Sequence, residues 1–121
     1  MKKLAKREEE LMQVLWKLEK AFVKEIIEEF PGKKKPHYNT VSTIIRILEN
    51  KGFVSHEAFG NSHRYYPVIS KEAYQSQALG DVVKNYFDNS IPKLVAYFAK
   101  EEQITPDELE EIIRLIKNKK S

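Results

Sequence analysis

The chain has no cysteine, only four glycines and five prolines among its 121 residues, and no apolar run near the roughly 18 residues of a membrane-spanning helix. Without cysteine it has no disulfide framework, thiolate metal site or cysteine nucleophile. Three acids lie within residues 1–10, where a secretory signal needs an apolar stretch. We therefore expect a cytoplasmic protein that does not insert into membranes.

Basic residues are concentrated in the middle of the chain. The whole sequence has 21 Lys and Arg against 18 Asp and Glu, and residues 1–29 hold seven of each sign. Residues 30–70 hold six basic residues and two acids, whereas residues 71–121 hold eight and nine. A basic excess confined to one segment is the electrostatic footprint expected of a protein that binds a polyanion.

The first part of the chain predicts three helices followed by a hairpin. The apolar stripes of the three helices span residues 11–18, 22–30 and 41–48. Strand-favouring residues then form two runs, 53–59 and 65–69, around Gly60-Asn61-Ser62. This order is typical of a winged helix-turn-helix, in which the third helix enters the major groove of DNA.

Helical periodicity returns after Ser70 in three pieces, so the expected fold class is mainly α with a small β-wing. Asn89-Ser90 separates the first two pieces, and Thr105–Glu108 forms a capping box at the start of the third. We expect a winged-helix DNA-binding domain at residues 1–70 and a helical dimerisation domain at residues 71–121.

The apolar stripes of the C-terminal helices exceed what one small wing could cover. Burying them is worth roughly 25 cal/mol per Å², and leaving them exposed would create an aggregation-prone patch. Pairing with a second copy is the expected solution, and a single six-helix monomer core is the alternative. The residues expected at the interface are Leu79, Val82, Val83, Tyr86, Phe87, Ile91, Leu94, Val95, Phe98, Leu109, Ile112, Ile113 and Ile116.

The outer face of the third helix carries residue types that reach base edges. At 100° per residue the face opposite the apolar stripe contains no acid. Its members are Asn39, Ser42, Thr43, Arg46 and Asn50. Simple solvent exposure is the alternative, but Asn, Ser and Thr each cost about a few tenths of a kcal/mol in a helix, so their clustering favours base contact.

The neighbouring loops supply candidates for phosphate contact. Lys33, Lys34 and Lys35 precede the third helix and would position the protein on DNA, and the alternative is a solvated loop. His63 and Arg64 follow the hairpin tip, where an inert turn is the alternative. The histidines lie in different elements without ligand spacing, so we expect no metal or other cofactor.

Four segments carry a resemblance to a known family. They are ELMQVLW at 10–16, NTVSTIIRILENKGF at 39–53, HRYYPVIS at 63–70 and LVAYFAKEEQITPDELEEI at 94–112. Together they are similar to the penicillinase-repressor family, also called BlaI/MecI/CopY. Its members are bacterial winged-helix repressors that bind operator palindromes as homodimers through their C-terminal helices. The resemblance therefore implies a transcriptional repressor that binds double-stranded operator DNA as a homodimer.

The resemblance also implies roles for individual residues. Thr40, Ser42, Thr43 and Arg46 match recognition-helix positions, Asn39 matches a backbone contact, and Arg64 matches the wing. Many members carry an arginine where this chain has Ile47, which the helical phase places beside the core. The full set of expected DNA contacts is Lys33, Lys34, Lys35, Tyr38, Asn39, Thr40, Ser42, Thr43, Arg46, His63 and Arg64.

Two routes of induction are known in this family. Drug-sensing members are cleaved at an Asn-Phe bond in the penultimate helix, where this chain has Tyr97-Phe98. The resemblance implies inactivation by cleavage at Tyr97-Phe98, with a membrane-bound sensor protease as partner. Copper-sensing members carry Cys-x-Cys near the C-terminus, so the lack of cysteine excludes that route.

Two other functions are alternatives to DNA binding. A winged helix used for protein contact without sequence-specific DNA binding is the main alternative, and an acidic outer face on the third helix would have favoured it. A hydrolytic enzyme has little support, because the sequence has no Gly-rich phosphate loop, metal-spaced ligands or nucleophile elbow. We therefore expect a protein that is not an enzyme.

Overall fold

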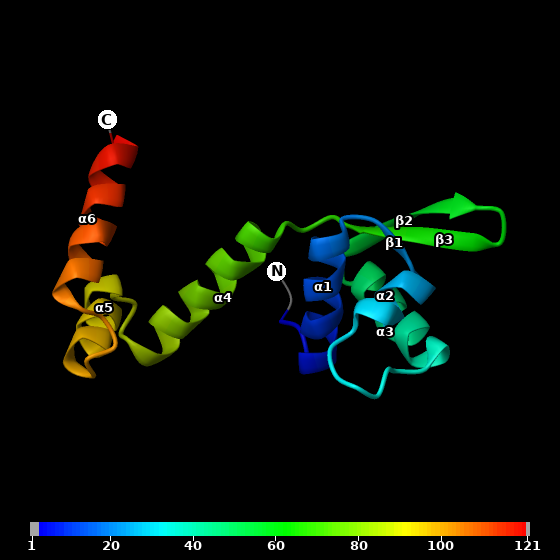
Figure 1. The fold of residues 1–121 in the computed structure, drawn as a ribbon, viewed down its shortest axis with the longest axis horizontal. Coiled ribbons are helices and arrows are strands. Elements are labelled where there is room, and N and C mark those ends of the chain that lie inside the picture. Colours follow the sequence, from blue (N-terminus) through cyan, green and yellow to red (C-terminus); the bar gives the residue numbers. More distant parts are fainter. Residues whose placement is uncertain (1–2, 121) are drawn as a thin grey trace. The chain divides into compact units, whose positions relative to one another are not determined.

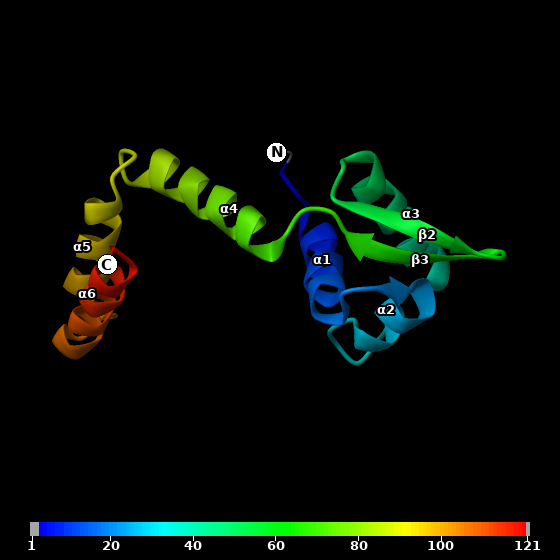
Figure 2. The same cartoon turned by 90° about the horizontal axis from the view of Figure 1, so that it is seen from above.

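The fold comes from a computed structural model that describes residues 3–120, with side chains through residue 118 (Figures 1 and 2). The chain forms two compact units, which divide between Gln77 and Ala78. Within the described part of the chain, no helix is long and apolar enough to cross a membrane.

The first unit consists of three helices and a small sheet within its described residues, followed by the first turns of a fourth helix. Its elements before that helix are α1 (Lys6–Leu18), β1 (Ala21–Phe22), α2 (Val23–Glu29), α3 (Tyr38–Asn50), β2 (Val54–Phe59) and β3 (Ser62–Pro67). The predicted helices and hairpin are confirmed. The hairpin of β2 and β3 extends beyond the helices as a narrow ribbon (Figure 1).

The strands pair antiparallel in the order β1-β3-β2. The prediction that Phe22 begins the second helix is wrong, because Phe22 pairs with Arg64 in β1. A strand of two residues is too short to show an alternating pattern. Phe22 instead continues the apolar pattern of α2, so the sequence assigns it to that helix. The Phe22 amide donates to Oε1 of Glu25 at 2.8 Å, which satisfies one backbone donor at the start of α2.

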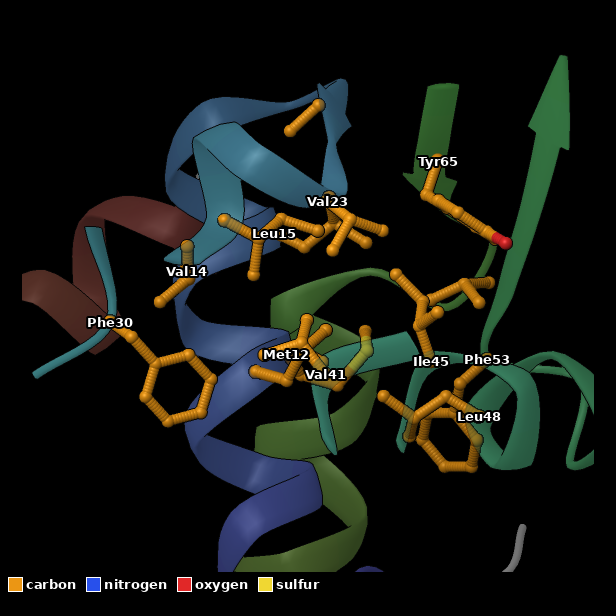
Figure 3. Close-up of a cluster of buried hydrophobic side chains, with 14 of the residues drawn as sticks. Met12, Val14, Leu15, Val23, Phe30, Val41, Ile45, Leu48, Phe53 and Tyr65 are labelled. Atoms are coloured by element: carbon orange, nitrogen blue, oxygen red, sulfur yellow. The ribbon is translucent and has the colours of Figure 1, made fainter. Parts of the chain in front are cut away.

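The core of the first unit lies between α1, α3 and the sheet. Met12 and Leu15 of α1 and Val41, Ile45 and Leu48 of α3 have no exposed surface. Figure 3 shows these side chains directed into one cluster. Because this burial occupies one face of α3, the opposite face remains outside the core.

The other helices confirm the three C-terminal pieces. They are α4 (Lys71–Tyr86), α5 (Ile91–Lys100) and α6 (Pro106–Lys120). Asp88 and Asn89 have φ of 52° and 57°, which ends α4 before α5 begins. The capping box is confirmed: the Thr105 amide donates to Oε1 of Glu108 at 2.9 Å, and the Glu108 amide donates to Oγ1 of Thr105 at 3.1 Å.

The division between the units falls inside α4, whereas the sequence placed its domain boundary after Ser70. The ring of Tyr74 lies 5.8 Å from that of Trp16 and 5.9 Å from that of Phe53, between ring centroids. The first turns of α4 therefore pack with the winged-helix unit, because an aromatic side chain there completes its core.

An ion pair with little exposure joins the start of α1 to the end of α3. Nζ of Lys51 lies 2.7 Å from Oε1 of Glu8, which also accepts a hydrogen bond from the Ala5 amide at 2.8 Å. Burial would raise the pKa of the Glu8 carboxyl, but the hydrogen bonds from Lys51 and Ala5 and the Lys51 charge outweigh burial and hold the pKa below 4.5. Such a group stabilises the fold at neutral pH, and its contribution is lost as the pH falls through the lowered pKa.

We predict that Glu8→Gln lowers the free energy of unfolding at pH 7 by about 1–3 kcal/mol, because Lys51 loses its carboxylate partner. The difference from the unsubstituted protein should shrink as the pH falls through the lowered pKa of Glu8, where this carboxyl itself becomes protonated. Urea unfolding at pH 7 and at about pH 3 measures both values.

Glu10→Gln is the matched control, because Glu10 makes only a 3.8 Å contact with the exposed Arg7 on the same helix. That variant should change the free energy of unfolding by less than about 0.5 kcal/mol. A Glu8→Gln effect that is the same at both pH values would contradict the role assigned to the carboxylate.

Candidate nucleic-acid interface

The outer face of α3 is polar and exposed, opposite the buried Val41, Ile45 and Leu48. None of its exposed polar side chains is acidic, and Ser42 beside them is half-buried. The exposed polar members are Asn39, Thr40, Thr43, Arg46 and Asn50. The predicted recognition residues therefore share one accessible face.

Two side chains on this face differ from what the sequence suggested. Oγ1 of Thr43 donates to the Asn39 carbonyl at 2.9 Å, so its hydroxyl offers the outside an acceptor and a neighbouring methyl group. Ile47 was expected beside the core, but its side chain is 39% exposed. It follows Thr43 by four positions and precedes Asn50 by three, so helical geometry puts it on their side.

A groove of about 710 Å³ lies between α3, the start of α2 and the wing. It brings together four predicted DNA contacts, namely Tyr38, Ser42, Arg46 and His63. Asn61 and Ser62 also line it and belong to the hairpin tip that the sequence predicted. Sequence reasoning missed its other walls, which are Phe22, Val23, Lys24, Glu25, Phe59 and Tyr65. The side chains of Arg46 and Lys24 give the groove two cations against the single carboxylate of Glu25.

The groove could not be found from sequence because three separate segments form it. Lys24 stands one residue inside α2, where the sequence pattern indicates an ordinary solvated position. Its place in the groove depends on β1, which brings the start of α2 beside the wing by pairing Phe22 with Arg64. The ring of Phe22 lies 5.8 Å from that of Phe59, so β1 also makes an aromatic contact with β2, on the far side of β3.

The wing presents His63 but not Arg64 to this groove. Neighbouring residues of a strand project to opposite faces, and Arg64 lines a separate hollow of about 480 Å³ with Trp16 and Tyr66. Nε of Arg64 is buried there without a hydrogen-bond partner among the described residues. The structure therefore separates two side chains that the sequence grouped together.

A chain of polar and aromatic contacts joins α3 to the wing. Nδ1 of His56 lies 2.7 Å from Oε2 of Glu49, and the rings of His56 and His63 stack with centroids 4.1 Å apart and planes 10° apart. The ring of Tyr65 contacts both imidazoles, with centroid distances of 5.5 Å to His56 and 6.1 Å to His63. Burial and the nearby Glu49 carboxylate raise the pKa of the Tyr65 phenol, against the opposing effect of Arg46, so this phenol stays neutral at pH 7.

The three lysines before α3 are exposed but not equivalent. Nζ of Lys35 donates to the carbonyl of Phe30, at the C-terminal end of α2. Lys33 and Lys34 make no hydrogen bond or ion pair within the described part of the chain. Of the three lysines, Lys33 and Lys34 are therefore the two whose ammonium groups have no hydrogen-bond or ion-pair partner among the described residues. Among residues 3–118, no group of three or more His, Asp or Glu side chains is arranged to hold a metal ion.

The expected interface residues of the second unit divide by exposure. Val83 is the only buried side chain described between residues 78 and 118. Five expected interface residues are half-buried: Phe87, Leu94, Val95, Phe98 and Leu109. The others are exposed: Leu79, Val82, Tyr86, Ile91, Ile112, Ile113 and Ile116. Leu115, which the sequence reasoning missed, widens the exposed stripe of α6.

The Tyr97-Phe98 bond lies within α5. The side chain of Tyr97 is 48% exposed, and its ring contacts that of Phe87 at a centroid distance of 5.6 Å. Phe98 is half-buried.

A winged helix whose third helix presents an exposed, acid-free polar face belongs to the class of DNA-binding proteins. The family profile described as penicillinase repressor matches residues 4–118, and the chain belongs to this family. The family consists of DNA-binding transcriptional repressors, which are not enzymes.

Relatives of known name extend over almost the whole chain. The methicillin resistance regulatory protein MecI of Staphylococcus aureus (strain N315) is 27% identical over 117 residues, which are 97% of this chain and 94% of the relative. MecI of Mammaliicoccus sciuri is 26% identical with the same coverage. The penicillinase repressor of Bacillus licheniformis is 23% identical over 112 residues, which are 93% of this chain and 88% of the relative.

Proposed function

We propose that this protein is a cytoplasmic repressor that binds a palindromic operator as a homodimer, with one α3 in the major groove at each half-site. The exposed, acid-free face of α3 beside a cationic groove is the observation that carries the proposal. A surface used only for protein contact has no need for Lys24 and Arg46 to line one groove beside a polar helix face.

Each group on this surface has a definite chemical part in the proposal. The planar guanidinium of Arg46 can donate two hydrogen bonds to O6 and N7 of a guanine. Thr43 offers an acceptor, and Ile47 offers an apolar contact for a thymine methyl group. Lys33 and Lys34, which have no hydrogen-bond or ion-pair partner among the described residues, contact phosphates and so contribute affinity without sequence preference.

The proposed dimer follows from the second unit. A unit with a single buried side chain among residues 78–118 has little core of its own, yet seven of the expected interface residues are exposed on it. The first unit, by contrast, encloses a complete core. A second copy of the same helices supplies the missing apolar surface with the two-fold symmetry that a palindrome requires.

Selection from a random pool of DNA duplexes tests the proposal with the full-length protein. We expect a two-fold symmetric sequence, with half-sites about one helical turn or a small multiple apart. Recovery of no preferred sequence, with equal affinity for all duplexes, would favour the protein-contact alternative.

We predict that Arg46→Ala and the pair Lys33→Gln with Lys34→Gln act differently. Arg46→Ala should cost about 1–3 kcal/mol on the selected sequence and relax preference at defined bases. The lysine pair should weaken binding to all duplexes and reduce the slope of log K against log salt by about 0.9 per lost phosphate contact. Fluorescence anisotropy over a salt series measures both. An unchanged ratio of selected to random DNA affinity in Arg46→Ala would show that α3 is misassigned.

A second prediction concerns the dimer. Ile116→Lys, at a side chain 51% exposed in the protomer, should weaken dimerisation by about 1–2 kcal/mol while the protomer stays folded. Val68→Lys is the matched control, since Val68 is an equally exposed apolar residue (56%) of the first unit. Sedimentation equilibrium gives the masses. A protein that is monomeric at micromolar concentration without substitution would refute the dimer.

The proposed inactivation is cleavage of the Tyr97-Phe98 bond by a membrane-bound sensor protease. A protease binds an extended chain, so α5 must open first. Two observations support an easy opening: α5 has ten residues and no buried side chain, and positive-φ residues, Asn89 and Glu102, stand next to its two ends. Cleavage there detaches α6 and its exposed stripe from the DNA-binding half.

We predict that separating α6 weakens operator binding through the dimer. A site-specific protease sequence inserted between Glu102 and Gln103 leaves α5 whole. The uncut protein should bind the selected duplex normally, and the cut protein should bind roughly 100-fold more weakly, because avidity is lost. Full binding after complete cleavage would refute the coupling.

The natural route is tested in the host cell. An immunoblot after addition of a cell-wall antibiotic should show loss of the full-length chain together with derepression. Derepression while the chain remains intact would exclude proteolysis as the signal.

A further inference from the structure

The segment that joins the wing to α4 is fixed along its backbone. The amides of Val68 and Ile69 both donate to the Phe53 carbonyl, at 2.8 and 3.3 Å. The Ile69 carbonyl accepts from Nε1 of Trp16 at 2.9 Å. Oγ of Ser70 then caps α4 by accepting from the Ala73 amide at 3.1 Å. These bonds leave no free linker between β3 and the first turn of α4.

The side chain of Tyr74 fastens that first turn to α1. Its half-buried ring contacts Trp16 and Phe53, and its hydroxyl donates to Oε2 of Glu9 at 2.7 Å. Burial and this hydrogen bond raise the pKa of the Tyr74 phenol to about 12, so the donor is present at every physiological pH. Rotation of the first turn of α4 would break all three contacts together.

Gly80, further along α4, lies where packing contacts among the described residues are absent, in contrast to Tyr74. It lies inside a 16-residue helix, and a Cβ built there would meet no heavy atom within 4 Å. Packing therefore does not require glycine at this position. Glycine is the least favourable residue after proline in a helix interior, because it leaves the backbone free to bend. Gly80 stands three residues past the division between the two units.

We propose that α4 is a jointed arm that sets which operator half-site separations the dimer accepts. The contacts of Tyr74 hold the first turns of α4 on the winged helix, and Gly80 is the point at which the rest of α4 can bend. The proposal rests on the proposed function, since it requires two DNA-reading units in one dimer. Tyr74 and Gly80 are positioning residues that contact no DNA.

Simple geometry shows why a small change in this arm matters. A helix of 16 residues is about 24 Å long at a rise of 1.5 Å per residue. A change of about 10° in its direction moves its far end by roughly 4 Å. Successive base pairs are about 3.4 Å apart. Looseness of this size at Tyr74 therefore matches the translation of a half-site along the DNA axis when one base pair is added or removed.

Binding to a spacer series tests the proposal. The duplex selected by the full-length protein is altered by −2 to +2 base pairs between its half-sites, and affinity is measured for each. Without substitution, each step away from the optimum should cost about tenfold. Tyr74→Leu should reduce this cost to about threefold or less, while Gly80→Ala should make it steeper. Affinity for a duplex with a single half-site and the mass of the dimer should not change in either variant.

Tyr74→Phe and Tyr66→Phe form a milder, matched pair. Tyr74→Phe removes only the hydrogen bond to Glu9 and should broaden the spacer profile to a smaller degree. Tyr66→Phe alters another half-buried tyrosine of the first unit and should leave the profile unchanged. If Tyr74→Leu does not fold, Tyr74→Phe and Gly80→Ala decide the question.

A distance measurement between the two protomers tests the flexibility of the arm in the absence of DNA. Because the chain has no cysteine, Glu28→Cys carries one spin label on the exposed side of α2 in each protomer. Pulsed dipolar spectroscopy of the free dimer should give a broader distance distribution with Tyr74→Leu and a narrower one with Gly80→Ala. No dipolar coupling in the unsubstituted dimer background would mean that the proposed dimer itself has failed. Normal coupling, with profiles and distributions that both variants leave unchanged, would overturn the jointed arm alone.

Discussion

Burial of Val41, Ile45 and Leu48 against α1 is the constraint on which the rest of the first unit depends. A helix at the surface buries only one of its faces in the core, and this packing determines which face of α3 remains exposed. The ion pair of Lys51 with Glu8 fastens the end of α3 to the start of α1, so α3 is held at its last turn as well as along its length. The polar outer face therefore has a fixed orientation beside the wing.

Charge and apolar surface are divided between the two units. The exposed face of α3 and its groove carry Arg46 and Lys24, whereas the exposed apolar side chains concentrate on α4, α5 and α6. A polar, cationic face is stable in water until a polyanion binds to it. An apolar face of that extent is not, and it requires a partner surface that covers it. The two units are thus suited to two different partners, which supports the proposed pairing of DNA and a second copy.

Local patterns in the sequence predicted most helices and strands correctly. Features formed by segments that are distant in the sequence were not predicted. The box at Thr105 and Glu108 and the periodicity of α3 depend on residues within four positions, and both are confirmed. Strand β1 has only two residues, and the sequence pattern assigns one of them, Phe22, to the helix that follows. The groove is invisible without β1. The error at Ile47 came from misjudging its helical phase, because Ile47 lies on the side of Thr43 and Asn50 and is exposed. The separation of His63 from Arg64 required the strand register.

The second unit is the natural place for control of the proposed repressor. Any signal that acts on α3 must alter the groups proposed to read DNA, and would change specificity together with affinity. A signal that acts on the helices after Gly80 changes only the coupling between two half-site contacts, which is worth about 10²- to 10⁴-fold in affinity. Because Val83 is the only buried side chain described there, each protomer holds these helices weakly without its partner. The sparse packing of the second unit therefore has two consequences. It makes this unit weakly stable in the isolated protomer, and it lets a small change there alter operator affinity strongly.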